Sequence, residues 1–493
     1  MEENNNDTAA WASIDDVADC TAGVDAQVRR VLGRVLAQRR SVEVAFGYLS
    51  ALAAGVEADC WSVAEEAGHQ GPHRMQALLG SYRWDWKDLR GELPGLAAAW
   101  LPCDPGDLIG PGIAVDETAQ LKHGDATACV APQHAGITGQ VENCVTTVFA
   151  AYVSTSGQAW ADFDIYMPDR WASDPQRRRA AGIPEDLTMT TKPDLAIGQV
   201  KRLMAAGLPA GWAAFDEVYT RSGALRAACE KAGLAYAGIV PCDFSITLPS
   251  GAVTRADQAV KDAVSERRSC GTGTKGPRLA DWALTGTASP RHFLLIRRLI
   301  SRPDQYTYYL CYAPPGRPAT MPYFVTIAGR RWPVEETFKT GKDLLSWDQS
   351  QARTWDAACR HTALSALAQL RHAAIRNALC GVIQLPPAAA AGSSPGSPGS
   401  DTHADADEAD LRIPLGDAPV PAYSGQPCPR RLGLIRLSVA ETARLARLAA
   451  DWASGLLTRA QLAFRLRWSA WRRRHQATAR WYHHAARLAA AAT

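Results

Sequence analysis

The spacing of apolar residues changes abruptly near residue 101, and this change restricts the folds that the chain can adopt. Upstream of it, apolar residues recur at helical spacing, at Val28, Val31, Leu32, Val35 and Leu36. Downstream of a boundary rich in Pro, Gly and Asp at residues 101–112, short strand-like runs replace the helical pattern. The sequence therefore predicts a helical domain over residues 1–105 and a strand-containing domain after it.

Residues 106–241 carry the pattern of a mixed sheet. The first three strand-like runs follow one another directly, which favours an antiparallel meander, and they cover residues 113–116, 128–131 and 145–153. Helical and strand-like runs then alternate over residues 195–204, 211–216, 222–229 and 234–240. The order βββαβαβ predicts an α/β (α+β) fold in which helices flank a mixed sheet.

The β-rich pattern continues over residues 242–325, where polar turns separate runs at 282–284, 292–300 and 306–312. This stretch is predicted to be an inserted β subdomain. Helical patterns return over residues 326–388, because Pro333 suits the first turn of a helix and a long helical run covers residues 354–378.

The last hundred residues divide into a linker and a tail. Residues 389–430 combine a Gly/Ser/Pro-rich stretch with an acidic run, which is typical of a flexible linker. Residues 431–493 contain two capping boxes, at Ser438 to Glu441 and at Thr458 to Gln461, and each predicts the start of a helix.

The tail is strongly basic. From Cys428 to the end there are 13 arginines and no lysine against Glu441 and Asp451, a net charge of +11 in a chain whose total is +3. Arg472, Arg473 and Arg474 lie beside tryptophans, a combination typical of nucleic-acid contact. The whole chain prefers arginine, with 44 arginines against 9 lysines. This preference alone would also explain the arginine-rich tail, without any nucleic-acid partner.

Basic and aromatic residues also alternate near the end of the helical N-terminal region. The segments 71–80 and 82–86 place Arg74, Tyr82 and Arg83 beside an apolar helix face. The pattern is compatible with a DNA-contacting domain and equally with a helical bundle that only covers the core.

Several classes of protein are excluded by simple patterns. The uncharged apolar stretches, such as residues 385–391, are far shorter than the roughly 20 residues that cross a bilayer, and the N-terminal residues are acidic where a signal peptide is basic. Twelve cysteines are spread singly without a Cys-x-x-Cys pair, which argues against a disulfide framework and a zinc site. We expect no membrane partner and a cytoplasmic location.

Three acids lie at the ends of predicted elements, where core packing does not require them. Asp116 and Asp216 each end a strand, and Glu335 lies in the first turn of a helix. Such carboxylates can converge at a sheet rim and supply the oxygen ligands that Mg²⁺ or Mn²⁺ prefers. Two such ions about 4 Å apart suit phosphoryl transfer. The chain has 50 acidic residues, however, so many other sets of three acids are possible.

Two cations accompany Glu335. Arg331 precedes it by four residues, and Lys342 follows it by seven, a spacing that predicts the same face of one helix two turns on. Both side chains are therefore candidates for phosphate contact.

Other candidates have simpler interpretations. Glu117 is expected on the opposite side of its strand from Asp116, solvated or salt-bridged, and Asp162 and Asp164 alternate like an exposed strand edge. Residues 271–277 lack the order of a phosphate-binding loop, so Lys275 and Arg278 are candidates for contact with a DNA backbone only. His361 has no partner at metal-ligand spacing and is expected to be a hydrogen-bonded helix residue.

Longer motifs indicate a family, and they occur at residues 113–118 (Ile-Ala-Val-Asp-Glu-Thr, followed by Lys122 and Gly124), 133–144, 182–186, 191–193, 215–219, 329–339 and 360–364. Over residues 25–385 the chain resembles bacterial insertion-sequence transposases of the DDE superfamily. The resemblance implies a ribonuclease-H-like core in which Asp116, Asp216 and Glu335 bind two Mg²⁺ ions, with Mn²⁺ as a substitute. It also implies a β insertion between the second Asp and the Glu.

The resemblance has one departure. The branch with this insertion has a signature in which Tyr is followed after two residues by Arg, then after three residues by Glu, and then after six residues by Lys. Arg331, Glu335 and Lys342 fit this spacing, but the tyrosine position is occupied by Ala328. Any step assigned to that tyrosine is therefore in doubt here. Glu336 is the neighbouring candidate for the third ligand, and the signature spacing favours Glu335.

The resulting hypothesis is a nucleoid-associated DNA transposase that cuts at terminal inverted repeats and joins the element to target DNA. Residues 1–105 would help bind the ends, the basic tail would add contacts, and synapsis of two ends implies a homodimer. Two alternatives remain: an inactive relative that only binds DNA, and a metal nuclease without strand transfer.

Overall fold

The computed structural model describes residues 11–259, 265–273, 276–384, 411, 413–416 and 433–492. The chain is 46% helical and 22% strand, which confirms the predicted α/β class. It divides into two compact units. The larger comprises Val31–Gly271 and Arg278–Leu370, and the smaller comprises Met1–Arg30, Thr272–Pro277 and Arg371–Thr493.

The N-terminal region is helical, as predicted. Its helices are α1 (Ile14–Val35), α2 (Arg39–Ala53), α3 (Cys60–Glu66), α4 (His73–Leu79) and α5 (Trp86–Trp100). Asp59 and Asp85 cap α3 and α5 by accepting hydrogen bonds from backbone N–H groups of the first turn. Helices α2, α3 and α4 contact one another around buried side chains that include Tyr48, Leu49 and Met75.

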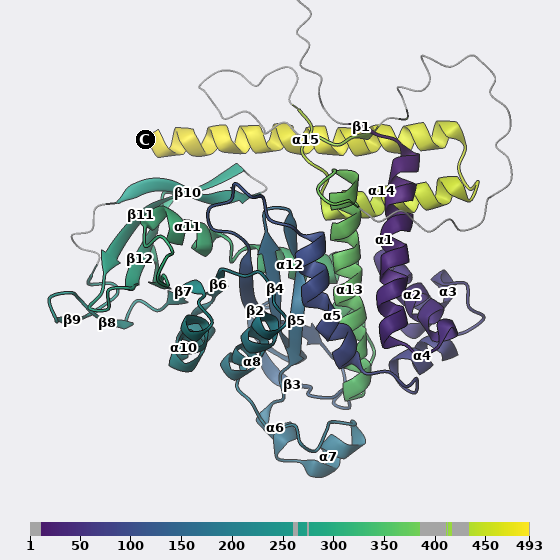
Figure 1. Ribbon diagram of the computed structural model, residues 1–493, viewed down its shortest axis with the longest axis horizontal. Helices are drawn as coiled ribbons and strands as arrows, with labels where there is room; N and C mark the ends of the chain where they lie inside the picture. The colour runs from purple at the N-terminus through teal and green to yellow at the C-terminus, as the bar shows by residue number, and fades with distance from the viewer. Residues whose placement is uncertain are drawn as a thin grey trace, which may run out of the picture. The chain divides into compact units, whose positions relative to one another are not determined.

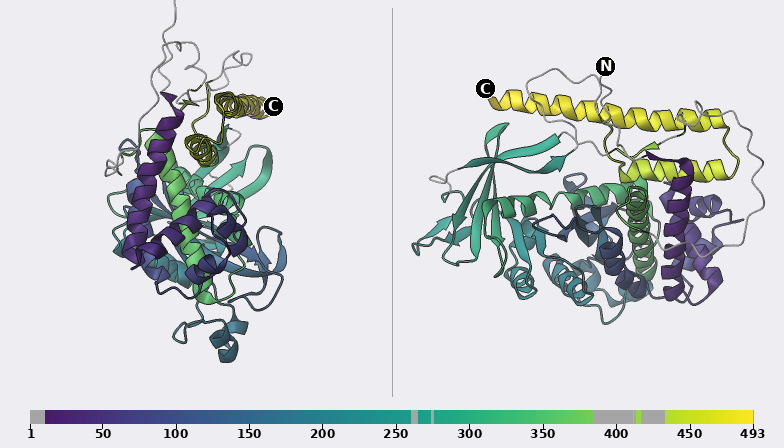
Figure 2. Two further views of the ribbon diagram at one scale, coloured as in Figure 1. Left: turned by 90° about the vertical axis from the view of Figure 1, so that its right-hand side faces the viewer. Right: turned by 45° about the horizontal axis from the view of Figure 1, so that its top comes forward.

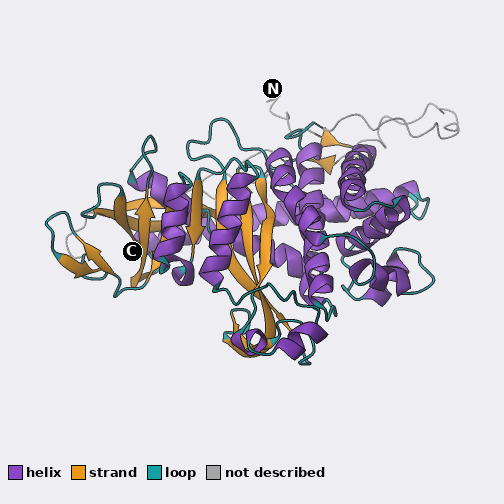
Figure 3. Ribbon diagram, turned by 60° about the horizontal axis from the view of Figure 1, so that its bottom comes forward, coloured by secondary structure: helices purple, strands orange, loops and turns teal. Residues whose placement is uncertain are grey.

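The core of the larger unit is a mixed sheet of ribonuclease-H-like topology (Figures 1 and 3). Its strands are β2 (Gly112–Leu121), β4 (Gln140–Ser154), β5 (Gly157–Ile165), β6 (Trp212–Phe215) and β7 (Ala235–Val240). They lie in the order β5-β4-β2-β6-β7, with β2, β6 and β7 parallel and β4 antiparallel to its neighbours. In this sheet residues 113–115 of β2 lie directly opposite residues 213–215 of β6.

Helices pack along this sheet, and they begin where the sequence predicts. Helix α8 (Lys192–Ala205) contacts β4 and β5, and Ser222 caps α10 (Gly223–Lys231). Three short helices, α6 (Asp169–Ala172), α7 (Pro175–Ala180) and α9 (Glu217–Thr220), lie in the connections. Helices α11 (Met321–Gly329), α12 (Pro333–Lys339) and α13 (Trp355–Leu379) follow the insertion.

One predicted strand is wrong. Residues 128–130 form a turn in which Cys129 has a φ of 64°, and strand β3 begins only at residue 131 (Ala131–Ala135). The Ala128 N–H donates to the carbonyl of Arg353, and that of Val130 to Thr127. A short apolar run alone does not distinguish a strand from a buried turn.

The insertion continues the core sheet. Strands β10 (Glu266–Gly273), β11 (Gly276–Gly286), β12 (His292–Leu299) and β13 (Arg302–Tyr312) follow in order, and β13 pairs antiparallel with β7. Strands β8 (Ser245–Thr247) and β9 (Val253–Arg255) form a separate ribbon. Gly329 lies against β10 so closely that a Cβ there would be 1.7 Å from the carbonyl oxygen of Cys270.

An aromatic cluster fixes α12 against the sheet. The rings of Phe149 and Trp160 stack with centroids 4.2 Å apart, and Phe338 of α12 lies 5.8 Å from Phe149. Helix α12 continues as a π-helical segment, η1 (Thr340–Leu344), in which Gly341 leaves room for the Trp160 ring; a Cβ there would be 2.2 Å from that ring. A short 3-10 helix, η2 (Trp347–Gln349), follows.

The smaller unit contains the tail helices α14 (Val439–Ala453) and α15 (Arg459–Ala492), which lie side by side (Figure 2). Both predicted helix starts are confirmed: Ser438 Oγ accepts from the Glu441 N–H at 3.1 Å, and Thr458 Oγ1 from the Gln461 N–H at 3.3 Å. The box at Thr458 is complete, because its N–H donates to Gln461 Oε1 at 2.9 Å, whereas the Glu441 carboxylate accepts from Arg444 and Arg472. Strands β1 (Trp11–Ala12) and β14 (Ile413–Pro414) pair beside them. Among the described residues, no helix is both long and apolar enough to cross a membrane.

Candidate active site

Sheet register brings two of the three predicted carboxylates together. Val115 of β2 lies opposite Phe215 of β6 in a parallel pair, and Asp116 and Asp216 are the next residues of the chain. Asp216 directly follows β6, as predicted, but the prediction that Asp116 ends its strand is wrong, because β2 continues to Leu121. Neighbouring strands are about 4.8 Å apart, so both acids occupy the same level of the sheet. Asp116 is only 8% exposed, and Asp216 caps α9 by accepting from the backbone N–H groups of Val218 and Tyr219 at 3.0 and 3.3 Å.

Arg331 connects Asp116 to the third carboxylate. Its Nη1 donates to Asp116 Oδ2 at 2.7 Å, and its Nη2 lies 3.7 Å from Glu335 Oε1, one helical turn further along. The Glu335 side chain is 41% exposed. The sequence-predicted acids and the arginine therefore form one group, with the guanidinium between Asp116 and Glu335.

An ion pair that the sequence analysis missed holds this segment in place. Both Nη groups of Arg330 donate hydrogen bonds to the Asp107 carboxylate, at 2.7 and 2.8 Å, and Nη1 also donates to the carbonyl of Gly110 at 2.8 Å. The bidentate geometry fixes the turn between α11 and α12. Arg330 and Asp107 are 223 residues apart, and no local pattern links them.

The carboxylates crowd one another electrostatically. Burial raises the pKa of Asp116 to about 7; Arg331 opposes the rise, while Asp216, Glu117 and Glu335 add to it. Burial also raises the pKa of Asp216, with the charge of Glu117 as the next cause. The group therefore holds more negative charge than its arginine neutralises.

Glu117 is salt-bridged, as predicted. Its carboxylate accepts from Lys192 Nζ at 2.8 Å and from the Tyr219 hydroxyl. The charge of Glu117 nevertheless reaches both aspartates and contributes to their raised pKa values.

Lys342 reaches the same strand by a different route from the one predicted. The expectation that it lies two α-helical turns after Glu335 is wrong, because η1 winds residues 340–344 as a π-helix. Its Nζ donates to the carbonyl of Ala119 in β2 at 3.1 Å, and burial lowers its pKa.

Asp162 and Asp164 are not an exposed strand edge, and that prediction is wrong. Asp162 is 2% exposed. Arg202 binds Asp162 at 2.8 Å and Asp164 at 2.5 Å, and Arg90 binds Asp164 at 3.1 Å. Helices α5 and α8 cover β5 and supply these arginines, so alternation of acids along this strand marks internal ion pairs.

The candidate DNA-contact residues of the insertion lie in different situations. Lys275 lies outside the described residues. Arg278 is half-buried, donates to the carbonyl of Gly329 at 2.8 Å, and lies 6.0 Å from the ring of Trp332, which is 50% exposed. These contacts connect the insertion to the turn that carries Arg331.

The three tail arginines also differ. Arg472 pairs with Glu441 at 2.7 Å. Arg473 is 2% exposed and donates to the backbone carbonyls of Ile435 and Leu415, so we assign it to the fold and withdraw it as a DNA contact. Arg474 is exposed.

His361 is the hydrogen-bonded helix residue that the sequence predicts. Its Nδ1 lies 2.9 Å from the Tyr48 hydroxyl and its Nε2 lies 2.9 Å from the carbonyl oxygen of Trp347. Burial lowers its pKa to about 4.

The donor set has the chemistry of a divalent-cation site. Within the described ranges, no three His, Cys, Asp or Glu side chains lie close enough together, as they stand, to hold a metal ion. The carboxylate oxygens of Asp116, Asp216 and Glu335 are nevertheless the ligands that Mg²⁺ and Mn²⁺ prefer. A cation among them would oppose both the burial and the repulsion that raise the pKa of Asp116.

Comparison with known proteins places the chain in a family. A family model described as a DDE superfamily endonuclease matches residues 20–284, which is more than half of the chain. A second model, described as a transposase DDE domain, matches residues 201–370. The first match includes Asp116 and Asp216, and the second includes Asp216 and Glu335. No curated protein matches the chain.

Proposed function

The chain belongs to the DDE superfamily of transposases and endonucleases, and from this premise we propose that it moves a DNA element by cut-and-paste transposition. Water attacks the phosphodiester at each end of the element, and the freed 3′-hydroxyl then attacks a phosphodiester of the target DNA. Each step forms one P–O bond and breaks another. No covalent protein–DNA intermediate is needed, so no nucleophilic side chain is required.

The observation that carries the proposal is the position of Asp116 and Asp216 at one level of the sheet, with Arg331 linking Asp116 to Glu335. We propose that these three acids hold two Mg²⁺ ions, with Mn²⁺ as a substitute. Bound ions supply charge stabilisation for the attacking and leaving oxygens.

The cations around the acids have a second role in this proposal. Once the carboxylate charge is neutralised, the Arg331 guanidinium is free to donate to a phosphate oxygen of the DNA, a partner that suits its planar fork. Lys342 contributes positive charge from the β2 side of the site. Both residues position the phosphate relative to the acids.

The proposed partners are DNA and a second copy of the chain. We assign binding of the terminal inverted repeats to the helical region 1–105, and further DNA contacts to Lys275 and Arg278 of the insertion and to Arg472 and Arg474 of the tail. Synapsis of two ends requires at least a homodimer.

The test uses a supercoiled plasmid that carries the gene with several hundred base pairs of native flank, so that the ends are present without being known. The wild type, Glu335→Gln and Glu336→Gln are incubated with it in Mg²⁺, and the products are sequenced. Glu336→Gln is the matched control, because it removes the same charge one residue further along the same helix.

Breaks at two defined ends together with joined products, lost in Glu335→Gln and kept in Glu336→Gln, are the expected result. Breaks without joined products would leave a metal nuclease that does not transfer strands. Binding without breaks in either Mg²⁺ or Mn²⁺ would mean that the chain is an inactive relative. Loss in Glu336→Gln alone would move the third ligand to that residue.

A further inference from the structure

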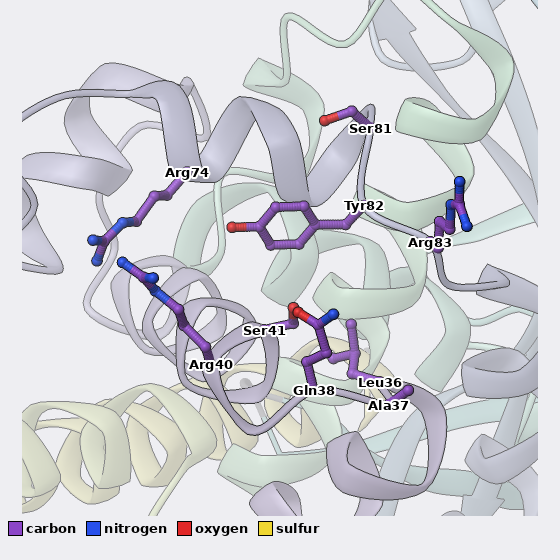
Figure 4. Close-up of a pocket in the computed structure, with 9 residues that line it drawn as sticks. All are labelled: Leu36, Ala37, Gln38, Arg40, Ser41, Arg74, Ser81, Tyr82 and Arg83. Atoms are coloured by element: carbon purple, nitrogen blue, oxygen red, sulfur yellow. The ribbon is translucent and has the colours of Figure 1, made fainter.

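A pocket with a volume of about 610 Å³ lies among the N-terminal helices of the larger unit (Figure 4). It is formed by the segment between α1 and α2, the first turn of α2, one residue of α4, and the loop that follows α4. Its lining residues are Leu36, Ala37, Gln38, Arg40, Ser41, Arg74, Ser81, Tyr82 and Arg83. None of these nine takes part in the carboxylate group described above.

The lining is cationic. It includes Arg40, Arg74 and Arg83, and none of the nine described lining residues is an acid. Figure 4 shows the side chains of Arg40 and Arg74 extending toward one another from two different helices, with the hydroxyl of Tyr82 directed toward the same space. Two like charges held side by side repel each other, and an anion between them would remove that repulsion.

Helix α2 adds to the positive field. Its first residues line the pocket, its first turn contains no acid, and no side chain caps it. The N-terminal end of a helix carries a partial positive charge that favours an anion nearby.

The loop that carries Ser81, Tyr82 and Arg83 is firmly held. The Tyr82 N–H donates to the carbonyl of Ala77 at 2.7 Å. Arg360 of α13, which is 6% exposed, donates to the carbonyls of Leu79, Gly80 and Trp84 at 3.1, 2.9 and 2.8 Å. The loop is therefore fixed on both sides of Tyr82, and the pocket is formed before any ligand binds.

We propose that this pocket binds a backbone phosphate of duplex DNA, with Arg40, Arg74 and the Tyr82 hydroxyl donating to its oxygens. The inference rests on the proposed function for the identity of the polyanion. Arginine guanidinium groups match the planar spacing of phosphate oxygens. Tyrosine hydroxyls, like arginines, are among the donors that contact DNA phosphates without reading the base sequence.

The experiment measures binding without cleavage. The full-length chain in EDTA is titrated into a fluorescent 40-base-pair duplex of arbitrary sequence at several NaCl concentrations. The variants are Arg40→Gln, Arg74→Gln, the double variant and Tyr82→Leu. Arg39→Gln is the matched control, because Arg39 is exposed and adjacent to Arg40 but does not line the pocket. Thermal unfolding of each variant verifies that it is folded.

We expect Arg40→Gln and Arg74→Gln each to weaken binding about tenfold near 0.1 M salt and to reduce the slope of log K against log[NaCl] by about 1. The double variant reduces the slope by about 1 in total, since both arginines hold one phosphate. Tyr82→Leu weakens binding about fivefold without changing the slope, because it removes an uncharged hydrogen-bond donor. Arg39→Gln leaves the affinity within about twofold of the wild type.

If Arg39→Gln and Arg74→Gln lost the same amount of DNA affinity, the effect would come from general surface charge, and the proposal would be overturned. Unchanged DNA affinity in Arg40→Gln and Arg74→Gln would also overturn it. A further arm adds inorganic phosphate or a nucleoside monophosphate: if either raises the melting temperature of the wild type but not of Arg74→Gln while DNA affinity is unchanged, the pocket holds a small phosphate compound instead. Failure of the transposase proposal would show as absent cleavage, a readout that this binding series does not use.

Discussion

Two groups of carboxylates, each around one buried aspartate, lie on or beside the same sheet of this molecule, and their charges are balanced differently. On β5, Asp162 and Asp164 meet Arg90 and Arg202, so two acids face two cations. Asp116 within β2 and Asp216 directly after β6 have Arg331 nearby, and Arg331 also pairs with Glu335.

We propose that this difference separates a structural group from a catalytic one. The β5 group is complete without any ligand, because each carboxylate is bound to an arginine from a covering helix. The β2–β6 group has three acids to one arginine, and burial with its neighbouring acids raises the pKa of Asp116 to about 7. An excess of negative charge around the buried Asp116 is unfavourable unless a cation compensates it, and DDE-superfamily transposases generally use divalent metal ions.

The largest expected effect concerns catalysis. Asp116→Asn is expected to lower the rate of plasmid cleavage by at least about 1,000-fold, because it removes a proposed metal ligand. The free energy of unfolding in metal-free buffer should stay equal or rise, since one of the crowded charges is gone. Cleavage kinetics and urea unfolding of the same preparation measure both. A variant that loses activity only in proportion to its lost stability would place Asp116 among the structural acids.

The second effect is on stability and belongs to the β5 group. Arg202→Met should lower the free energy of unfolding by about 3 kcal/mol, because it leaves Asp162 and Asp164 with one arginine in place of two. Cleavage per folded molecule at low temperature should remain close to that of the wild type. Urea unfolding with a cleavage assay measures both quantities, and a selective loss of cleavage in a fully stable protein would contradict the structural role.

Metal binding supplies a third, smaller effect. At a concentration ten times its dissociation constant, Mg²⁺ should raise the free energy of unfolding of the wild type by about 1.4 kcal/mol. Glu335→Gln should lose most of that gain, while Asp162→Asn should retain it even though its starting stability is lower. Thermal unfolding with and without Mg²⁺ gives the increments, and equal increments in all three proteins would mean that the ion binds elsewhere.

The smallest effect is a dependence on pH. Burial and the charge of Asp164 raise the pKa of Asp162 to about 6, so the native carboxyl keeps a proton that the unfolded chain has already lost, and stability falls as the pH rises from about 4 to about 6. Arg202 opposes that rise in pKa. Arg202→Met should therefore destabilise the protein more at pH 8 than at pH 5, by about 1 kcal/mol. An equal loss at both pH values would mean that Asp162 does not titrate in this range.

Local sequence patterns were sufficient to predict most element starts and the candidate acids. Ser222, Ser438 and Thr458 cap helices because a hydroxyl at the N-cap satisfies backbone N–H groups within three residues. Asp116 and Asp216 could be found because each directly follows an apolar strand run. The continuation of β2 beyond Asp116 could not be found in this way, because residues 117–121 are held by pairing with β4.

Features that depend on distant residues could not be predicted in this way. The burial of Asp162 depends on Arg202, which is 40 residues away in the sequence. The turn before α12 depends on the ion pair between Asp107 and Arg330, which are 223 residues apart in the sequence. The π-helical segment that carries Lys342 depends on the room that Gly341 leaves for Trp160. The cationic pocket was predicted only in part: the sequence singles out Arg74, Tyr82 and Arg83, but nothing local indicates that residues 36–41, with Arg40, join them.

The most direct test of the account replaces Mg²⁺ with Fe²⁺ in the full-length protein. Ascorbate and peroxide then generate hydroxyl radicals at the bound ion, and the cut sites in the backbone are mapped by mass spectrometry. The account predicts cuts near residues 116, 216 and 335, suppressed by excess Mg²⁺ and absent in Asp116→Asn. Cuts centred on residues 162–164, or a pattern that survives Asp116→Asn, would contradict it.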